Sequence, residues 1–265
     1  MIRLPEELAR RPVRGCVESR LWGNVGYTLP EQVVEFPAGI THIPSNPFVG
    51  LNGITAFSVA DNHPVFEAVD GVLYSKEDQR LVAYPDARPG ESYEVVDGTR
   101  IIGINAFAVS NRMEVILPDS ILEVGDHGMY LFGSDRLSLP AGLKRMGDYA
   151  FTPIMMNTVT IPKGIEHIGI NPFASCNWLS DIKLASNSRY AVVKGVLFNK
   201  KDKLLISYPA AKGADSYTVP KDTKAIGPSA FERAQVNEIK VGDAVTSIGR
   251  RAFGASMLTS MQLPS

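Results

Sequence analysis

The chain has 265 residues, of which 45% are hydrophobic and 21% are charged, so it is long and apolar enough to bury a sizeable core. A formal net charge of −1, without a stripe of Lys and Arg, excludes the usual nucleic-acid binder, which must neutralise several phosphates. The sequence has no run of about 18 apolar residues, so no transmembrane segment is predicted.

The chain begins with MIRLPEELARRPVRG, a charged stretch broken by Pro5 and Pro12. A secretory signal peptide needs roughly 7 to 15 consecutive apolar residues, which this stretch lacks. We expect residues 1–30, including Trp22 and Tyr27, to form an N-terminal cap. With no signal peptide in the chain, a cytoplasmic location stays open.

From residue 31 onward, short phrases alternate apolar and variable positions, as strands with one buried face do. Most end in proline, which cannot donate to a sheet ladder and therefore ends the strand. The expected strands are VEFP (Val34–Pro37), FSVA (Phe57–Ala60), YEVV (Tyr93–Val96), VILP (Val115–Pro118), LSLP (Leu137–Pro140), VTIP (Val159–Pro162), IKLA (Ile182–Ala185), YTVP (Tyr217–Pro220), IKVG (Ile239–Gly242) and MQLP (Met261–Pro264).

A second phrase, I-G-x-x-A-F, recurs mostly at steps of 22 residues. We expect its last residue to stack in a buried spine, and its glycine to adopt backbone torsions that only glycine reaches cheaply. The spine positions are Phe107, Met129, Phe151, Phe173, Phe231 and Phe253. The glycines are Gly103, Gly125, Gly147, Gly169, Gly227 and Gly249.

A longer repeat contains this short one. GVLYSKEDQRLVAYPDA (71–87) returns as GVLFNKKDKLLISYPAA (195–211), identical at nine of seventeen positions. The flanking phrases match at nearly the same offset, which indicates two copies of a block of about 124 residues, the second incomplete. We interpret each stretch as a β-hairpin inserted into one turn, with a charged tip that is either solvated or a binding edge.

One strand in each turn of 22–23 residues is typical of a leucine-rich-repeat solenoid. We predict that residues 31–265 form about ten turns with a parallel β-sheet on the concave face. The turns leave too few residues for long helices, so the convex side is expected to be short helical or irregular chain. The two β-hairpin insertions interrupt this array.

The pattern L-x-x-I-x-L-P-x-x-L-x-x-I-G-x-x-A-F-x-x-C carries a family resemblance. LPDSILEVG, LPAGLKRMG, IPKGIEHIG and HIGINPFASC match it, and over about Val34 to Ser265 the chain resembles the BspA-like leucine-rich-repeat family of bacterial surface proteins. The resemblance implies adhesion to, or recognition of, host proteins such as those of the extracellular matrix. It also implies an extracellular or cell-surface location and no catalytic residues.

The residues with reactive or metal-binding side chains do not form a recognisable constellation. Cys176 occupies a position taken in other turns by Ser110, Ile154, Ala234 and Ser256, which predicts a core residue rather than a nucleophile. The histidines His42, His63, His127 and His167 are too dispersed to converge on a metal. No nucleotide-binding or hydrolase motif occurs. We therefore predict no enzyme, no cofactor and no metal site.

The candidate partner-binding surface is the row of side chains between the two buried positions of each strand. The row is polar, begins acidic and becomes basic, which favours a protein partner held by complementary charges. Its members are Glu35, Ser58, Glu94, Ile116, Ser138, Thr160, Lys183, Thr218, Lys240 and Gln262. The alternative is a surface or intracellular scaffold or spacer without a host ligand.

The final strand phrase, MQLPS, stops halfway through a turn. A bare strand edge invites pairing. We therefore expect either that the natural protein continues beyond Ser265 or that this strand associates end to end with another chain.

Overall fold

The computed structural model describes residues 2–3, 7–8, 11–12, 27–108, 113–130 and 137–263, with side chains from residue 32 onward. This part of the chain consists of strands and turns, without any helix, so the helical alternative for the convex side is wrong. Much of the predicted cap lies outside the described residues. Its described strands are β1 (Ile2–Arg3), β2 (Glu7–Leu8) and β3 (Arg11–Pro12).

The predicted strands form a first series, which we call the LP series. Its members are β4 (Tyr27–Phe36), β5 (Leu51–Val59), β9 (Ser92–Glu94), β11 (Glu114–Ile116), β14 (Thr158–Ile161), β16 (Asp181–Leu184), β20 (Ala214–Thr218), β22 (Val236–Lys240) and β24 (Ser260–Gln262). All pairs are parallel, as expected, but they form separate sheets rather than one: β1–β4–β5, β9–β11, β14–β16 and β20–β22–β24.

One predicted strand is absent. Leu137–Pro140 is irregular, and among the described residues no backbone hydrogen bond joins it to β11 or β14. Leu137 and Leu139 nevertheless pack against the main core cluster. The alternation of apolar residues therefore predicted burial correctly and strand pairing incorrectly.

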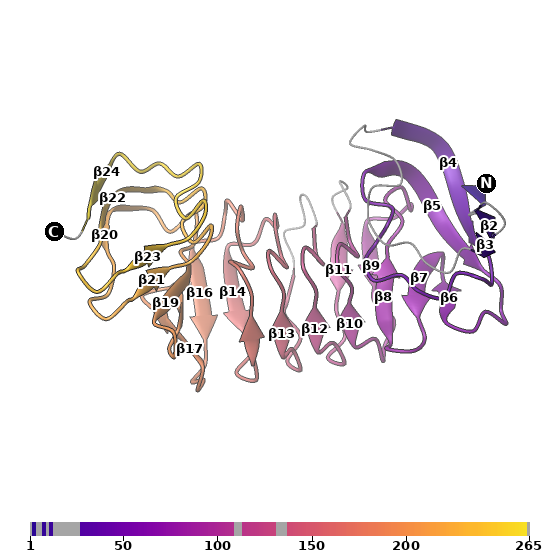
Figure 1. Cartoon of the computed structure of the whole chain (residues 1–265), viewed down its shortest axis with the longest axis horizontal. Helices are drawn as coiled ribbons and strands as arrows, with labels where there is room; N and C mark the ends of the chain where they lie inside the picture. Colours follow the sequence, from indigo (N-terminus) through magenta and orange to yellow (C-terminus); the bar gives the residue numbers. More distant parts are fainter. Residues whose placement is uncertain are drawn as a thin grey trace.

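A second series of strands, the IG series, replaces the expected helical or irregular convex side. It consists of β8 (Arg80–Ala83), β10 (Ile101–Ile102), β12 (Glu123–Val124), β13 (Arg145–Met146), β15 (His167–Ile168), β19 (Leu204–Ser207), β21 (Ala225–Ile226) and β23 (Ser247–Ile248). The strands form two parallel ladders, β8–β10–β12–β13–β15 and β19–β21–β23. Figure 1 shows β10, β12 and β13 side by side along the lower edge of the molecule.

The two predicted hairpins interrupt the array, and each is continuous with a strand of the IG series. β6 (Phe66–Val69) and β7 (Val72–Ser75) pair antiparallel and continue into β8, and β17 (Tyr190–Val193) and β18 (Val196–Asn199) do the same with β19. The third strand of each hairpin joins the IG series by parallel pairing with β10 or β21. Each hairpin therefore ends as the IG strand of a turn of its own.

The spine of large apolar side chains is confirmed except that Phe253 is only partly buried, and it includes two tyrosines. The side chains of Phe107, Phe151 and Phe231 are completely buried. Tyr84 stacks on Phe107 with ring centroids 5.2 Å apart, and Tyr208 stacks on Phe231 at 4.9 Å. These tyrosines fill the spine position in the two hairpin turns, and the inserted hairpin accounts for the remaining length of each interval.

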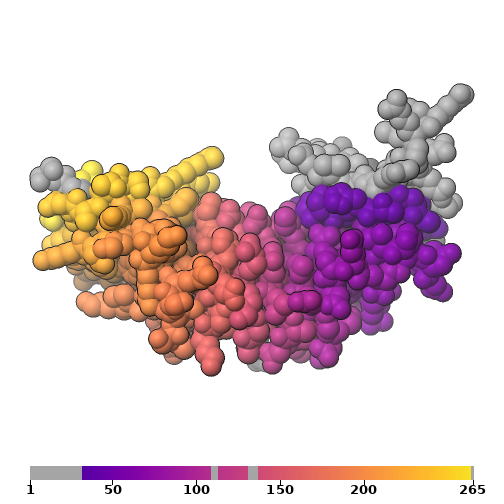
Figure 2. All heavy atoms as spheres, turned by 60° about the horizontal axis from the view of Figure 1, so that its bottom comes forward, coloured from indigo at the N-terminus to yellow at the C-terminus, as the bar shows by residue number. Residues whose placement is uncertain are grey.

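The turns are arranged along the long axis of an elongated molecule (Figure 1). β4 and β5 lie at one end, and β20, β22 and β24 lie at the other. In the space-filling view, the yellow C-terminal end rises above the middle of the molecule on one side (Figure 2).

The recurring glycines serve close contact rather than an unusual torsion, which corrects the expectation. None of the six lies in the left-handed region, whereas an added Cβ at Gly147 would lie 2.6 Å from Asp126 N. The strained torsion falls two residues later, on non-glycine residues with φ between 50° and 55°: Asn105, His127, Tyr149, Ser229 and Arg251. A side chain at the glycine would push adjacent turns apart.

This close contact predicts an effect on stability. Gly169→Ala should lower the free energy of unfolding by about 1–3 kcal/mol, because the added Cβ would lie 2.8 Å from the backbone N of Asp148. The matched control is Gly242→Ala, whose Cβ would have no neighbour within 4 Å. Denaturant unfolding that gives both variants the same stability would contradict this role of the glycine.

Candidate binding surface

The ten predicted partner-binding residues, which we call the outward row, lie on the solvent side of the LP series. All are exposed except Glu35, which is partly buried. Neighbours within each sheet are in register: Glu35 with Ser58, Glu94 with Ile116, Thr160 with Lys183, and Thr218 with Lys240 and Gln262. Ser138 is exposed outside any strand, so it extends the row without a ladder partner.

The outward row carries opposite charges toward its two ends. Glu35 and Glu94 belong to the first sheets, and Lys183 and Lys240 belong to later ones. Lys240 lies 3.8 Å from Glu238 on the same strand, a surface ion pair that moderates its charge. The polarity of the row is therefore set chiefly by Glu94 and Lys183.

A groove crosses the outward row where Leu137–Pro140 leaves the ladder. It has a volume of about 510 Å³ and is lined by Glu114 to Leu117, Leu137, Ser138 and Met156 to Thr158. Ile116 is 48% exposed beside it, so this is an apolar point on an otherwise polar row. The sequence could not indicate the groove, because the groove forms where a strand that the apolar alternation predicts is absent.

Each hairpin also borders a small pocket beside the following turn. The first, of about 270 Å³, is lined by Glu67, Tyr74 and Lys76 among others. The second, of about 120 Å³, has Ala191, Phe198 and Lys200 at the equivalent positions, 124 residues later. The two pockets lie at equivalent places in the repeat, but Ala191 in the second replaces the charged Glu67 of the first. The two pockets therefore do not form a matched pair of sites.

Each hairpin is fixed to the preceding turn by one buried or half-buried side chain at the same repeat position. In the first hairpin, His63 Nδ1 accepts hydrogen bonds from the backbone N–H groups of Val65 and Phe66. Its ring also lies against the carbonyl groups of Pro37 and Ile40, and burial lowers its pKa below the ordinary value. The imidazole is therefore neutral in the folded protein.

Asn187 makes the equivalent contacts in the second hairpin. Its Oδ1 accepts hydrogen bonds from the N–H groups of Arg189 and Tyr190, and its Nδ2 donates to the carbonyls of Lys163 and Ile165. The amide oxygen thus takes the place of His63 Nδ1 as the acceptor, whereas no hydrogen-bond partner of His63 Nε2 is found among the described residues. Only the imidazole can be protonated near neutral pH.

This difference predicts a pH dependence. Because the folded pKa of His63 is below its unfolded value of 6.5, the unfolded chain takes up a proton first, and stability falls as the pH drops below 6.5. His63→Asn should keep the stability of the wild-type protein at pH 7.5 and lose less of it at pH 5. Thermal unfolding at several pH values measures both, and equal losses in the two proteins would contradict the prediction.

The reactive side chains behave as core or surface residues. Cys176 is completely buried, its Sγ donates to the carbonyl of Phe151, and burial raises the pKa of its thiol to about 12. His42 and His167 are exposed in different turns. Within the described residues, no group of three or more His, Cys, Asp or Glu side chains could hold a metal ion. Ser110 and Cys16 lie outside the described residues.

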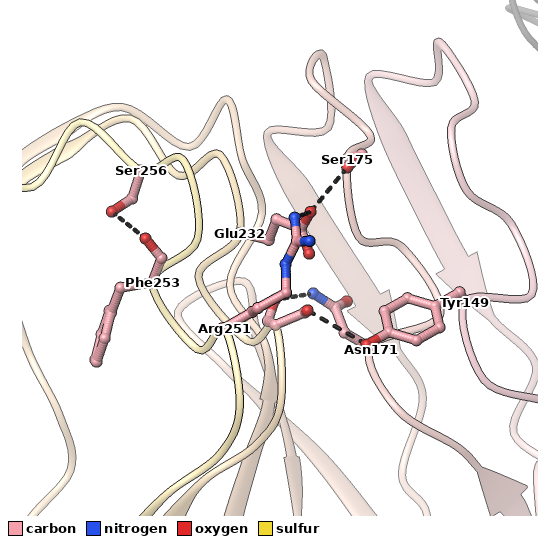
Figure 3. A network of polar contacts seen from close by, with 8 residues as sticks. Tyr149, Asn171, Ser175, Glu232, Arg251, Phe253 and Ser256 are labelled. Carbon is pink, nitrogen blue, oxygen red and sulfur yellow. Dashed lines mark hydrogen bonds and ion pairs between the residues drawn. The ribbon is translucent and has the colours of Figure 1, made fainter.

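A polar network that the sequence analysis missed joins the turns before and after the second hairpin (Figure 3). Asn171 Nδ2 donates to the carbonyl of Ser229 at 2.6 Å, and the hydroxyl groups of Tyr149 and Ser229 lie 3.3 Å apart. Glu232 accepts from Ser175 and pairs with Arg251. The signal in the sequence was the phrase N-P-F, which replaces x-A-F in the turns that precede each hairpin.

The parallel strand pairing and the spine define the chain as a leucine-rich-repeat solenoid. The sequence profile of the BspA-type leucine-rich-repeat region matches residues 89–204 and 210–265, with six copies. This match covers more than half of the chain, which therefore belongs to the BspA-type leucine-rich-repeat family.

Solved bacterial structures share this fold. The chain is 20% identical to a leucine-rich cell surface protein from Faecalibacterium prausnitzii, with a TM-score of 0.54 over 99% of this chain and 69% of the other. It is 20% identical to a leucine-rich-repeat protein from Eubacterium ventriosum, with a TM-score of 0.51 over 88% of this chain and 60% of the other. No curated protein matches the chain.

The described strands and turns include no helix with the length and apolar character needed to cross a bilayer.

Proposed function

We propose that this chain is a non-catalytic protein-binding module that recognises an extracellular host protein through the outward row. The observation that carries the proposal is the exposure of these side chains in register on consecutive LP strands. A repeated array of this kind offers one extended surface to a partner.

The chemistry of the outward row favours a polypeptide over other ligands. The row contains no aromatic residue on which a sugar ring could stack, and its charges are separated along the molecule. Separated, exposed charges act mainly on the encounter rate and on partner choice. Ile116, beside the groove, adds an apolar anchor near the middle of the row.

Charge reversal tests this surface. Glu94→Lys with Glu35→Lys, or Lys183→Glu with Lys240→Glu, should lower the association rate constant by about tenfold at low salt and less at high salt. Surface plasmon resonance over a panel of purified extracellular-matrix proteins measures the rate constants. Glu77→Lys and Lys201→Glu are single charge-reversal controls on the exposed hairpin tips. Unaltered kinetics at low salt would sink the proposal.

We also propose that the protein acts at the cell surface or outside the cell, in keeping with the cell-surface name of its structural neighbour. An antibody against this chain should then label intact source cells and detect a species larger than 28.8 kDa. Labelling only after lysis would favour the alternative, an internal scaffold or spacer without a host ligand.

A further inference from the structure

The turn before each hairpin meets the IG strand of the hairpin turn, and the first of these two junctions is filled by an arginine. Arg80 Nη1 donates to the carbonyl of Pro44 at 3.2 Å, and its Nε lies 3.1 Å from Asp78 Oδ2. The side chain is only 19% exposed, and its Cγ and Cδ lie against Gly103. A guanidinium group thus bridges a carboxylate and a carbonyl in a half-buried slot.

A direct backbone contact also closes the first junction. Ser45 and Ile104 form an isolated parallel bridge, and the backbone N–H of Asn46 donates to the carbonyl of Ile104 at 3.0 Å.

The second junction has the same ladder pairing between its IG strands but no arginine. Leu204 pairs with Ala225 as Arg80 pairs with Ile101, so Leu204 stands at the arginine position. Pro228 replaces Ile104, and proline has no backbone N–H for a bridge. No backbone hydrogen bond corresponding to that of Asn46 is found among the described residues of this junction.

A cleft of about 250 Å³ occupies the place that the arginine fills in the first junction. Its apolar walls include Leu204, Ile206 and Pro228, and its polar lining includes Asp148, Asn199 and the backbone of Gly169. Gly169 is the repeat equivalent of Pro44, whose carbonyl accepts from Arg80. The backbone position that accepts from a guanidinium in the first junction therefore lines a cleft in the second.

The acidic residue of the first junction recurs at the second. Asp202 stands at the position of Asp78 and accepts a hydrogen bond from Asn199 Nδ2 at 2.8 Å. Asp148 adds a carboxylate to the cleft, with its Oδ1 accepting from the N–H of Ile170 at 2.7 Å. A planar guanidinium suits such a slot, because it donates in several directions and packs its flat faces on apolar walls.

We propose that this cleft receives an arginine side chain presented by a partner polypeptide. The bound guanidinium would take the place of the missing Arg80 equivalent, between the Asp148 carboxylate and the Gly169 carbonyl. The cleft adjoins Asn171, which Figure 3 shows in the network that joins the turns before and after the second hairpin. It lies on the IG series, so the proposal does not depend on binding at the outward row.

The test uses the full chain, labelled with ¹⁵N, and Nα-acetyl-arginine amide as the probe. We expect saturable shifts of the amide signals of Gly169, Ile170, Asn199 and Gly227. The citrulline analogue, which has the same shape without charge, and the lysine analogue, which has charge without the planar fork, should shift these signals much less. Equal shifts with all three probes would overturn the proposal.

The two junctions provide reciprocal variants. Leu204→Arg should fill the cleft from within and abolish the shifts, and Arg80→Leu should open the first junction and add shifts at Ser45 and Gly103. Asp148→Asn keeps a hydrogen-bond acceptor while removing the charge, and should weaken the probe by about twofold to fivefold, as expected for an exposed or half-buried ion pair. Undiminished shifts in folded Leu204→Arg, or in Asp148→Asn if the first variant does not fold, would refute the assignment.

Discussion

Backbone hydrogen bonds between residues one repeat apart set the spacing of the turns. The N–H of Gly147 donates to the carbonyl of Val124 at 2.8 Å, and that of Gly169 donates to Met146 at 2.9 Å. The glycines permit this approach because any side chain there would meet the backbone of the preceding turn. Spine stacking, burial of the Ile and Val residues and alignment of the LP strands all depend on turns held at this distance.

Duplication preserved this backbone plan while the side chains at equivalent positions diverged. His63 and Asn187 perform one structural task with different protonation chemistry. Arg80 and Leu204 stand on the same ladder position, but one closes a junction and the other leaves a cleft. The two copies are therefore a natural comparison within one molecule, since the surroundings are shared and the substituted residue is not.

The sequence predicted the features that depend on a period and on burial. The LP strands, the spine and the exposure of the outward row all follow from alternating apolar residues 22 positions apart. It did not predict the IG ladder, because strands of two residues are too short for an alternation to appear. The irregular conformation of Leu137–Pro140 could not be predicted either. Alternating apolar residues show which face of a segment is buried, and not whether the segment forms hydrogen bonds with neighbouring strands.

The candidate site was predictable only in part, for a related physical reason. The residues of the outward row follow from the position between two buried ones. The groove and the cleft at the second junction depend on contacts between turns and on what a neighbouring side chain fills. Pro228 and Leu204 look unremarkable in the sequence and acquire meaning only beside Ile104 and Arg80.

The interruption of the LP series at Leu137–Pro140 has a mechanical consequence. The IG ladder runs unbroken from β8 through β15 past this point, so adjacent turns are tied along one edge and open along the other. We expect such a joint to bend about its tied edge. Bending there would change the separation between Glu94 and Lys183, which lie on either side, and with it the curvature of the outward row.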